Sequence, residues 1–194
     1  MDVSRETTDR LTRYEALLRK WNRAINLVSP STIDQIATRH IEDSAQILEL
    51  APPTRAWLDL GSGGGLPGVV LAILRDDGRD LTLMEADKRK CEFLRTVRRE
   101  LGLHYEIVQD RIENAPAQAA DIISARALAP LPQLLALASR HAVPKTQYLF
   151  PKGQSWRSEI EAARETWQFD CDVVPSRTDP AAAILCIRKV SPAP

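Results

Sequence analysis

Apolar positions recur at helical spacing along the first fifty residues. Between residues 4 and 22 they lie three or four positions apart, which predicts an amphipathic helix with its apolar side formed by Leu11, Tyr14, Leu17, Leu18 and Trp21. After a break, Ser31 or Asp34 can cap a second helix that reaches about Leu50. Pro52 and Pro53 end this N-terminal helical piece.

From residue 56 onward, short apolar runs alternate with amphipathic segments. The runs predict strands at residues 56–60, 81–84, 105–108, 121–124, 147–150, 168–174 and 182–189. The amphipathic segments predict helices at residues 67–75, 87–101, 111–118, 131–140 and 155–166, and a turn is expected at residues 76–78. The expected fold is therefore α/β: a mostly parallel, Rossmann-like sheet of seven strands, covered on both faces, with an antiparallel hairpin at one edge.

The length of 194 residues fits one domain with a small appendage. We expect a helical extension at residues 1–52, an α/β domain at residues 53–190 and a flexible tail at residues 191–194. The chain has no run of 18 apolar residues and its N-terminus is polar, so we expect neither a membrane segment nor a signal peptide. The cysteines have neither metal nor disulfide spacing, which indicates inert thiols at Cys91, Cys171 and Cys186.

The formal net charge is zero, which argues against a general polyanion binder. Basic residues nevertheless gather on the predicted helix at residues 87–101, at Lys88, Arg89, Lys90, Arg95, Arg98 and Arg99. Because Glu92 and Glu100 are interleaved with them, this face is either an ordinary solvated surface or an RNA-facing patch.

A glycine-rich turn follows the first predicted strand and leads into a helix. Residues 57–68 read Trp-Leu-Asp-Leu-Gly-Ser-Gly-Gly-Gly-Leu-Pro-Gly, an order typical of nucleotide-binding corners. Gly63, Gly65 and Gly68 fit the dinucleotide pattern, but Asp59 stands two residues before Gly61. This acidic frame resembles the first motif of class I methyltransferases, where a carboxylate suits the cationic end of S-adenosylmethionine. A tight turn without a ligand is the alternative, although so many glycines are costly to order.

Five short blocks, taken together and in order, resemble one family. They are residues 21–27 (Trp-Asn-Arg-Ala-Ile-Asn-Leu), 39–44 (Arg-His-Ile-Glu-Asp-Ser), 59–68, 124–127 (Ser-Ala-Arg-Ala) and 152–153 (Lys-Gly). The family is the small-subunit ribosomal RNA guanine-N7 methyltransferases, also called glucose-inhibited division protein B, and the resemblance covers residues 10 to 165. Leu66 stands where many members have Phe, and residues 109–111 (Gln-Asp-Arg) stand where a Gly-Arg pair is common.

The resemblance implies a class I methyltransferase fold and a cytoplasmic bacterial enzyme, by default a monomer. It would transfer a methyl group from S-adenosylmethionine to N7 of one guanine in the 16S rRNA of the small ribosomal subunit. No metal is expected. Three other functions are considered: a class I methyltransferase for a small molecule or protein, an NAD-dependent oxidoreductase, and an inactive RNA-binding protein.

The expected cofactor residues follow the carboxyl ends of the first four strands. They are Asp59, Gly61, Gly63, Leu66, Glu85, Ile112, Glu113 and Arg126. Asp59 could instead cap the turn, and Asp87 competes with Glu85 for the ribose hydroxyls because it too follows the second strand. Ile112 and Glu113 are assigned to the adenine side by analogy with the family.

The expected RNA contacts are basic or polar and lie at the same rim: Arg39, His40, Arg126 and Lys152. Arg126 could grip either the cofactor carboxylate or an RNA phosphate, and Lys152 is a phosphate candidate. His40 and Asp43 share a helix face, but a structural role is favoured over an acid–base pair. Guanine N7 has a free lone pair, so no general base is needed and the enzyme would act by positioning, with Arg126 as the positioning residue.

Overall fold

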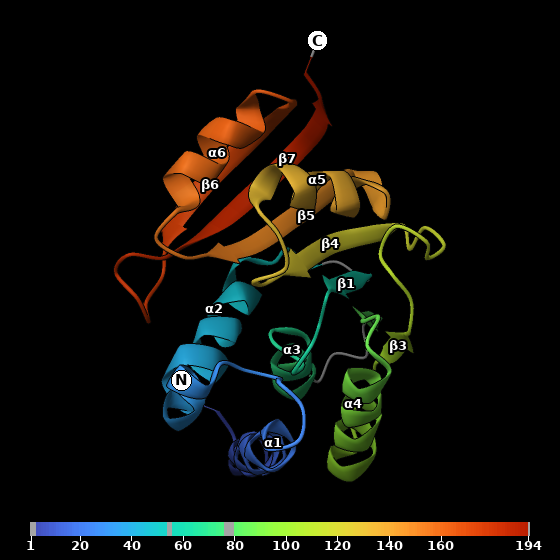
Figure 1. The fold of residues 1–194 in the computed structure, drawn as a ribbon, viewed down its shortest axis with the longest axis vertical. Coiled ribbons are helices and arrows are strands. Elements are labelled where there is room, and N and C mark those ends of the chain that lie inside the picture. The colour runs from blue at the N-terminus through green and yellow to red at the C-terminus, as the bar shows by residue number, and fades with distance from the viewer. Residues whose placement is uncertain (1–2, 54–55, 76–79, 194) are drawn as a thin grey trace.

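The computed structural model describes residues 3–53, 56–75 and 80–193, so the turn expected at residues 76–78 lies outside the described residues. The described residues form one seven-stranded sheet in the order β3-β2-β1-β4-β5-β7-β6. Its strands are β1 (Trp57–Leu60), β2 (Leu81–Met84), β3 (Glu106–Val108), β4 (Ala120–Ala125), β5 (Ala142–Lys152), β6 (Trp167–Pro175) and β7 (Ala183–Pro192). The first five run parallel, and β7 pairs antiparallel with β5 and β6, which confirms the expected fold class (Figure 1).

Helices cover both faces of this sheet. They are α1 (Arg5–Asn22), α2 (Asp43–Leu50), α3 (Gly68–Leu74), α4 (Lys88–Leu101), α5 (Leu131–Ser139) and α6 (Trp156–Arg164). One hydrophobic cluster contains residues of α1, α2, α3 and α4 together with one face of the sheet. A second cluster contains residues of α5 and α6 together with the opposite face. Within β1 the faces alternate, because Trp57 belongs to the first cluster whereas Leu58 and Leu60 belong to the second. No helix in the described part of the chain is long and apolar enough to cross a membrane.

The N-terminal helices pack against the same core as the α/β part. Tyr14, Leu18, Ile36 and Ile47 have no exposed surface and share a cluster with Val69. Figure 1 shows α1 and α4 at the lower end of the molecule, with α3 between them and β1.

The second N-terminal helix is not continuous, contrary to expectation. It divides into a 3-10 helix, η1 (Pro30–Gln35), a π-helix, η2 (Ile36–Glu42), and α2. No side chain caps η1, so neither Ser31 nor Asp34 has the expected role. Apolar spacing does not separate helices of 3.0, 3.6 and 4.4 residues per turn over so short a segment.

Two further expectations are corrected near the sheet edges. Residues 111–118 form turns without a helix, although Ile112 and Ala115 are buried as an amphipathic pattern requires. Residues 191–193 of the expected tail are paired, because β7 extends to Pro192 and the Ala193 backbone N–H donates to the Thr166 carbonyl at 2.9 Å. Pairing with the neighbouring strand orders residues that composition alone suggests are loose.

Candidate active site

The turn after β1 needs glycine for its backbone conformation. Gly61, Gly63 and Gly65 adopt φ angles of +62°, +54° and +81°, a left-handed region in which a Cβ is costly. The Ser62 backbone N–H donates to the Met84 carbonyl at 3.1 Å, which fixes the turn against β2. The loop therefore lies at the carboxyl end of β1, where open α/β sheets bind ligands.

Most of the space left by these glycines is filled by protein. A Cβ at Gly65 would overlap Val69, one at Gly68 would overlap Leu83, and one at Gly64 would lie 3.2 Å from the Leu27 carbonyl oxygen. Gly63 differs, because a Cβ there would meet only the Gly61 carbonyl oxygen at 3.7 Å. The open space at the turn is thus centred on Gly63. It is smaller than the presence of four closely spaced glycines suggests.

Asp59 lies beneath the turn, with no exposed surface. Its carboxylate accepts from the Ser124 hydroxyl at 2.8 Å and from the Gly68 backbone N–H at 3.2 Å. Burial raises the pKa of this carboxyl to about 6, against the opposing hydrogen bonds. The structure favours the capping role for Asp59, since the side chain secures the start of α3 from below.

Glu85 connects the glycine turn to the end of β2. Its two carboxylate oxygens accept from the backbone N–H groups of Gly63 and Asp87, each at 2.8 Å. Asp87 is occupied elsewhere, because its side chain caps α4 by accepting from the backbone N–H groups of Arg89 and Lys90. Of the two acids, Glu85 is the one that faces the turn.

The other expected cofactor residues are less open. Leu66 is 6% exposed and packs in the first hydrophobic cluster. Ile112 is buried in the second cluster, where its carbonyl oxygen lies 2.9 Å from His141 Nε2. Glu113 is exposed and its side chain lies 3.7 Å from the Arg111 guanidinium. A contact of Leu66 or Ile112 with a ligand would need local movement of the core.

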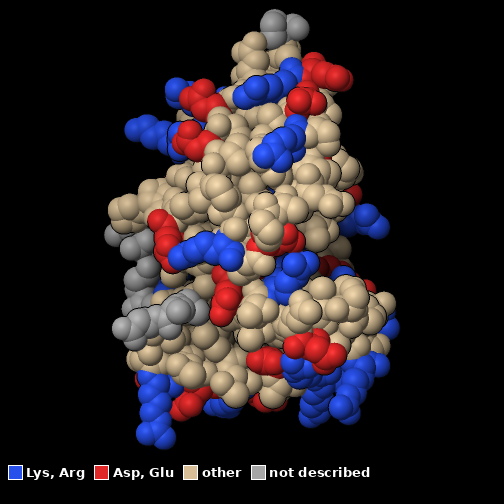
Figure 2. All heavy atoms as spheres, turned by 90° about the vertical axis from the view of Figure 1, so that its left-hand side faces the viewer, with Lys and Arg blue, Asp and Glu red and all other residues tan. Residues whose placement is uncertain are grey.

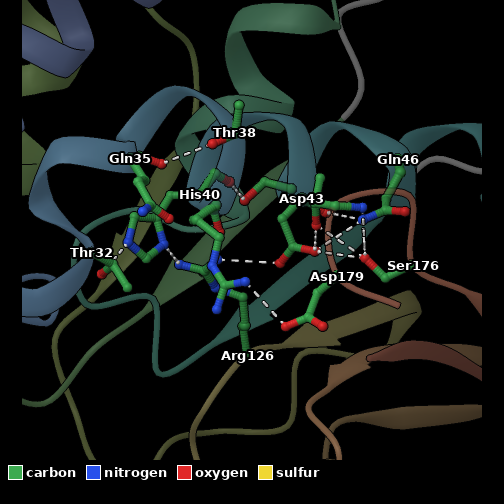
Figure 3. Close-up of polar contacts among 12 residues, drawn as sticks. Thr32, Gln35, Thr38, His40, Asp43, Gln46, Arg126, Ser176 and Asp179 are labelled. Atoms are coloured by element: carbon green, nitrogen blue, oxygen red, sulfur yellow. Dashed lines mark hydrogen bonds and ion pairs between the residues drawn. The ribbon is translucent and has the colours of Figure 1, made fainter. Parts of the chain in front are cut away.

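Arg126 follows β4 and points toward the N-terminal helices (Figure 3). Its guanidinium lies 2.9 Å from His40 Nδ1, 3.3 Å from Asp43 Oδ2 and 3.3 Å from the Arg39 carbonyl oxygen. Its side chain is only 16% exposed. Arg126 therefore joins the end of β4 to η2 through His40 and Asp43. This arrangement agrees with the prediction that His40 and Asp43 have a structural role and are not an acid–base pair.

His40 is held in one neutral tautomer by its neighbours. A guanidinium only donates, so Nδ1 must accept from Arg126 and Nε2 must carry the proton. Nε2 then donates to the Thr32 hydroxyl at 2.8 Å, and that hydroxyl donates to the Ser29 carbonyl. Burial and the Arg126 charge lower the pKa of His40 to about 4. With both ring nitrogens occupied, His40 is not available as a general base or as an RNA ligand.

Asp43 fastens the connection between β6 and β7 to η2. Its Oδ1 accepts from Gln46 Nε2 at 2.9 Å and from the Thr178 hydroxyl at 3.0 Å. Arg39 forms a second link, with its guanidinium 3.1 Å from Asp179. The C-terminal hairpin is therefore part of the site, although it lies about 130 residues away in sequence.

Lys152 does not have the expected form of a free phosphate ligand. Its ammonium group donates to Glu159 at 2.7 Å and to the Ala129 carbonyl at 2.8 Å, and its side chain is 9% exposed. Glu159 also accepts from the Leu131 backbone N–H. Lys152 instead clamps the loop between β4 and α5 against α6.

A cleft of about 670 Å³ opens beside these groups. Its walls come from η2, the loop after β4, the end of β5 and the β6–β7 connection, and they include Arg39, His40, Asp43, Arg126, Leu128, Lys152, Glu159, Thr178 and Asp179. Leu128 connects the cleft to the glycine turn, because a Cβ at Gly61 would lie 2.6 Å from Leu128 Cδ1. A ligand at the turn and a second ligand in the cleft would therefore be neighbours.

Sequence reasoning missed several residues of this site. The Tyr14 hydroxyl donates to the Gly64 carbonyl at 2.5 Å, which ties α1 to the glycine turn. Asn22 accepts from the backbone N–H groups of Leu27 and Val28 and so holds the next loop against the turn. Asn22 lies in a block that the resemblance had singled out, but nothing local indicates the roles of Glu159 and Asp179.

Some of the basic side chains of α4 have protein partners, and its two interpretations, a solvated surface and an RNA-facing patch, stay predictions. Arg95 contacts Gln109 and Glu92, and Arg98 donates to the Tyr105 carbonyl. On the face shown in Figure 2, basic and acidic side chains lie next to one another over most of the surface, with Lys and Arg gathered at the lower end.

Solved structures with the same fold support the class of protein. A mutant of MtNAS in complex with S-adenosylmethionine matches with a TM-score of 0.64, at 16% identity over 94% of this chain and 75% of that one. The 16S rRNA N2 G1207 methyltransferase of T. Thermophilus, in complex with AdoMet and guanosine, matches with a TM-score of 0.60, at 16% identity over 80% of this chain and 40% of that one. These likenesses show that the chain has the class I methyltransferase fold.

Sequence comparison gives the family. The family model of rRNA small subunit methyltransferase G matches residues 7–180. Curated proteins named ribosomal RNA small subunit methyltransferase G are 49% identical in Ruegeria sp. (strain TM1040), over 98% of this chain and 94% of that protein, and 51% identical in Paracoccus denitrificans (strain Pd 1222), over 95% and 96%. The chain belongs to the rRNA small subunit methyltransferase G family. This membership confirms the resemblance. The alternative functions of an oxidoreductase or a small-molecule methyltransferase are therefore not retained.

Proposed function

We propose that the protein methylates N7 of one guanine in the 16S rRNA of the small ribosomal subunit. The observation that carries this is family membership across nearly the whole chain, including the segments that build the cleft. A ribosomal substrate also implies a cytoplasmic location, and we propose that the protein acts as a monomer.

The residues of the glycine turn fit S-adenosylmethionine. Gly63 has open space where a side chain would otherwise stand, and the Glu85 carboxylate lies at the edge of that space, bonded to the Gly63 backbone N–H. We propose that Gly61, Gly63 and Glu85 contact the cofactor directly. Asp59 supports the turn from beneath, and Glu113 contacts the adenine side. Leu66 and Ile112 pack in the core behind the site and would contact the cofactor only after local movement.

When bound, S-adenosylmethionine supplies an electrophilic methyl group, which N7 of guanine attacks with a free lone pair. The protein therefore has no proton to remove, which agrees with the neutral, fully engaged His40. Arg126 acts by position, because it fixes η2 and the loop after β4 on either side of the cleft. Positioning of this kind can supply about 7 to 11 kcal/mol of the barrier.

The RNA contacts proposed from sequence are reassigned by exposure. Arg39, with a side chain 42% exposed at the rim of the cleft, remains a direct RNA contact. His40, Arg126 and Lys152 contribute by shaping the cleft, since each is largely buried as well as bonded to protein groups.

The test is tritium transfer from labelled S-adenosylmethionine to small subunits that lack the modification, followed by mapping of the labelled base. Label at N7 of a single guanine is the expected result. Naked 16S rRNA and fully modified subunits are the parallel samples, and the second should take up no label. Cofactor binding without label in either RNA form would contradict the proposed substrate while leaving the methyltransferase class intact.

A further inference from the structure

The described cleft is lined by cations that are all paired. Arg39, Arg126 and Lys152 each form an ion pair with a carboxylate that also lines the cleft, at N–O distances of 3.1, 3.3 and 2.7 Å. The carboxylates are, in the same order, Asp179, Asp43 and Glu159. A cleft with balanced charges attracts a phosphate weakly but suits an uncharged polar group such as a nucleobase.

The three carboxylates differ in what they can still accept. Asp43 and Glu159 lie in pairs whose side chains are at most 19% exposed, and both receive further hydrogen bonds from the protein. Asp179 is 32% exposed and accepts one bond at each oxygen, from Arg39 and from the Ala181 backbone N–H at 2.9 Å. Each carboxylate oxygen can accept about two hydrogen bonds, so Asp179 can still accept hydrogen bonds in the cleft.

Building on the proposed function, we propose that Asp179 recognises the target guanine by accepting hydrogen bonds from its N1–H and N2–H groups. These two donors lie side by side on the Watson–Crick edge, and a carboxylate offers two matching acceptors. N7 lies on the opposite side of the purine. A guanine held at Asp179 would therefore direct N7 away from Asp179 and into the cleft, which is also lined by Leu128 beside the glycine turn.

The charge that develops during the reaction gives Asp179 a second effect. As the N7–C bond forms, the C–S bond of the donor breaks and its electron pair stays on sulfur, so the positive charge moves onto the base. A carboxylate bonded to N1–H stabilises that charge more strongly in the transition state than in the bound substrate. Loss of Asp179 should then reduce kcat and not only raise KM.

The first test is Asp179→Asn on small subunits that lack the modification. Asparagine keeps an oxygen that can accept from the Ala181 N–H, but its amide nitrogen would face the donors of guanine. The same substitution removes the ion pair with Arg39, and the change of substrate described next separates that effect from the loss of base recognition. We expect kcat/KM for methyl transfer to fall about tenfold to a hundredfold, with cofactor Kd and Tm unchanged. The matched control is Asp172→Asn, because Asp172 is an exposed carboxylate of β6 that is paired with Arg188 at 2.6 Å. The activity of this control variant should stay at the wild-type level.

The second test changes the substrate and so does not depend on how a variant folds. Subunits reconstituted with inosine at the target position lack the N2 amino group but keep N7. We expect kcat/KM of the wild-type protein to be about tenfold lower on inosine than on guanine. For Asp179→Asn, we expect kcat/KM to differ little between the two bases. The assignment of Asp179 would be overturned if the wild-type protein had equal rates on the two bases. It would also be overturned if the residue change and the base change each lowered kcat/KM by the same factor alone and in combination.

The two proposals fail in different ways. If the wild-type protein labels no guanine N7, the proposed function is at fault. If it labels guanine N7 and Asp179→Asn does so at the same rate, the proposed function stands and only the role of Asp179 is refuted.

Discussion

Gly61 and Gly102 adopt the same left-handed backbone conformation in different surroundings. Their φ angles are +62° and +61°, but a Cβ at Gly61 would meet Leu128 at 2.6 Å whereas one at Gly102 would meet nothing within 4 Å. We expect alanine at either position to cost about 1 to 2 kcal/mol of stability through backbone strain. Only Gly61→Ala should also weaken S-adenosylmethionine binding, by roughly tenfold or more, and Gly61→Arg should abolish it.

Titration calorimetry and urea unfolding of both variants separate the two effects. If Gly61→Ala and Gly102→Ala bind the cofactor equally well, the cofactor does not approach the turn at Gly61.

His40 makes stability depend on pH. Its pKa falls from 6.5 to about 4 on folding because of burial and the Arg126 charge, so between these values the unfolded chain binds more protons than the native state. The stability from this residue is therefore complete above pH 6.5 and is lost as pH falls toward 4. Between pH 7.5 and pH 5 the loss should be about 2 kcal/mol.

Asp59 acts in the opposite direction over this range, because its raised pKa of about 6 makes the native state bind more protons than the unfolded chain. Urea unfolding of the wild-type protein and of His40→Gln at the two pH values should therefore give stability changes that differ by about 2 kcal/mol, with the wild type losing more. The matched control is His104→Gln, which changes an exposed histidine and should follow the wild type. A pH dependence that His40→Gln leaves unchanged would place the titrating group elsewhere.

The role of a residue was predictable from sequence where it depends on a particular backbone conformation or on a continuous motif. The glycine turn and Glu85 lie where they were expected, because strand, turn and acid are adjacent or regularly spaced in the chain. The part played by Lys152 was not predictable, since its partner Glu159 reaches it only when α6 packs beside β5.

At the scale of elements, α1 supports the glycine turn through one buried hydroxyl. Tyr14 is fully buried and donates to the Gly64 carbonyl. Tyr14→Phe leaves that carbonyl without this donor, so we expect a loss of about 1 to 2 kcal/mol in stability together with weaker cofactor binding. The measurements are urea unfolding and cofactor titration.

Tyr105→Phe is the matched control for this change. Tyr105 is also buried and its hydroxyl donates to the Leu94 carbonyl at 2.7 Å, away from the turn. It should lose similar stability and keep cofactor affinity. Loss of affinity in both variants would mean that general destabilisation, and not the contact with Gly64, controls binding.

Element types followed from periodicity wherever a segment was long or strongly patterned, as in α1, α4 and the seven strands. The irregular η1–η2 segment did not, because its form depends on distant contacts from Arg126 and from the Asp179 loop. Helix interruptions of this kind are frequent at functional sites, and here they direct Arg39 and His40 toward the cleft.

At the scale of the whole molecule, the N-terminal helices are part of the core. Tyr14, Leu18, Ile36 and Ile47 are fully buried against the α/β part. At about 1.5 to 3 kcal/mol each, their burial matches the total stability of a typical domain, about 5 to 15 kcal/mol. We therefore expect a chain without residues 1–50 to show no cooperative unfolding in urea when followed by circular dichroism. A sharp transition in that fragment would mean that the α/β part folds independently.

The sequence by itself determined the class of fold, the position of the cofactor turn and the family, because these depend on local periodicity and on motifs that are continuous in the chain. Only the tertiary structure decided which charged groups in the cleft are fully engaged and which can still accept a hydrogen bond. Arg126 and Asp43 are engaged and Asp179 can still accept hydrogen bonds, since packing brings η2, the loop after β4 and the β6–β7 connection to one place. Hydrogen bonding between residues far apart in sequence leaves no local pattern from which it could be read.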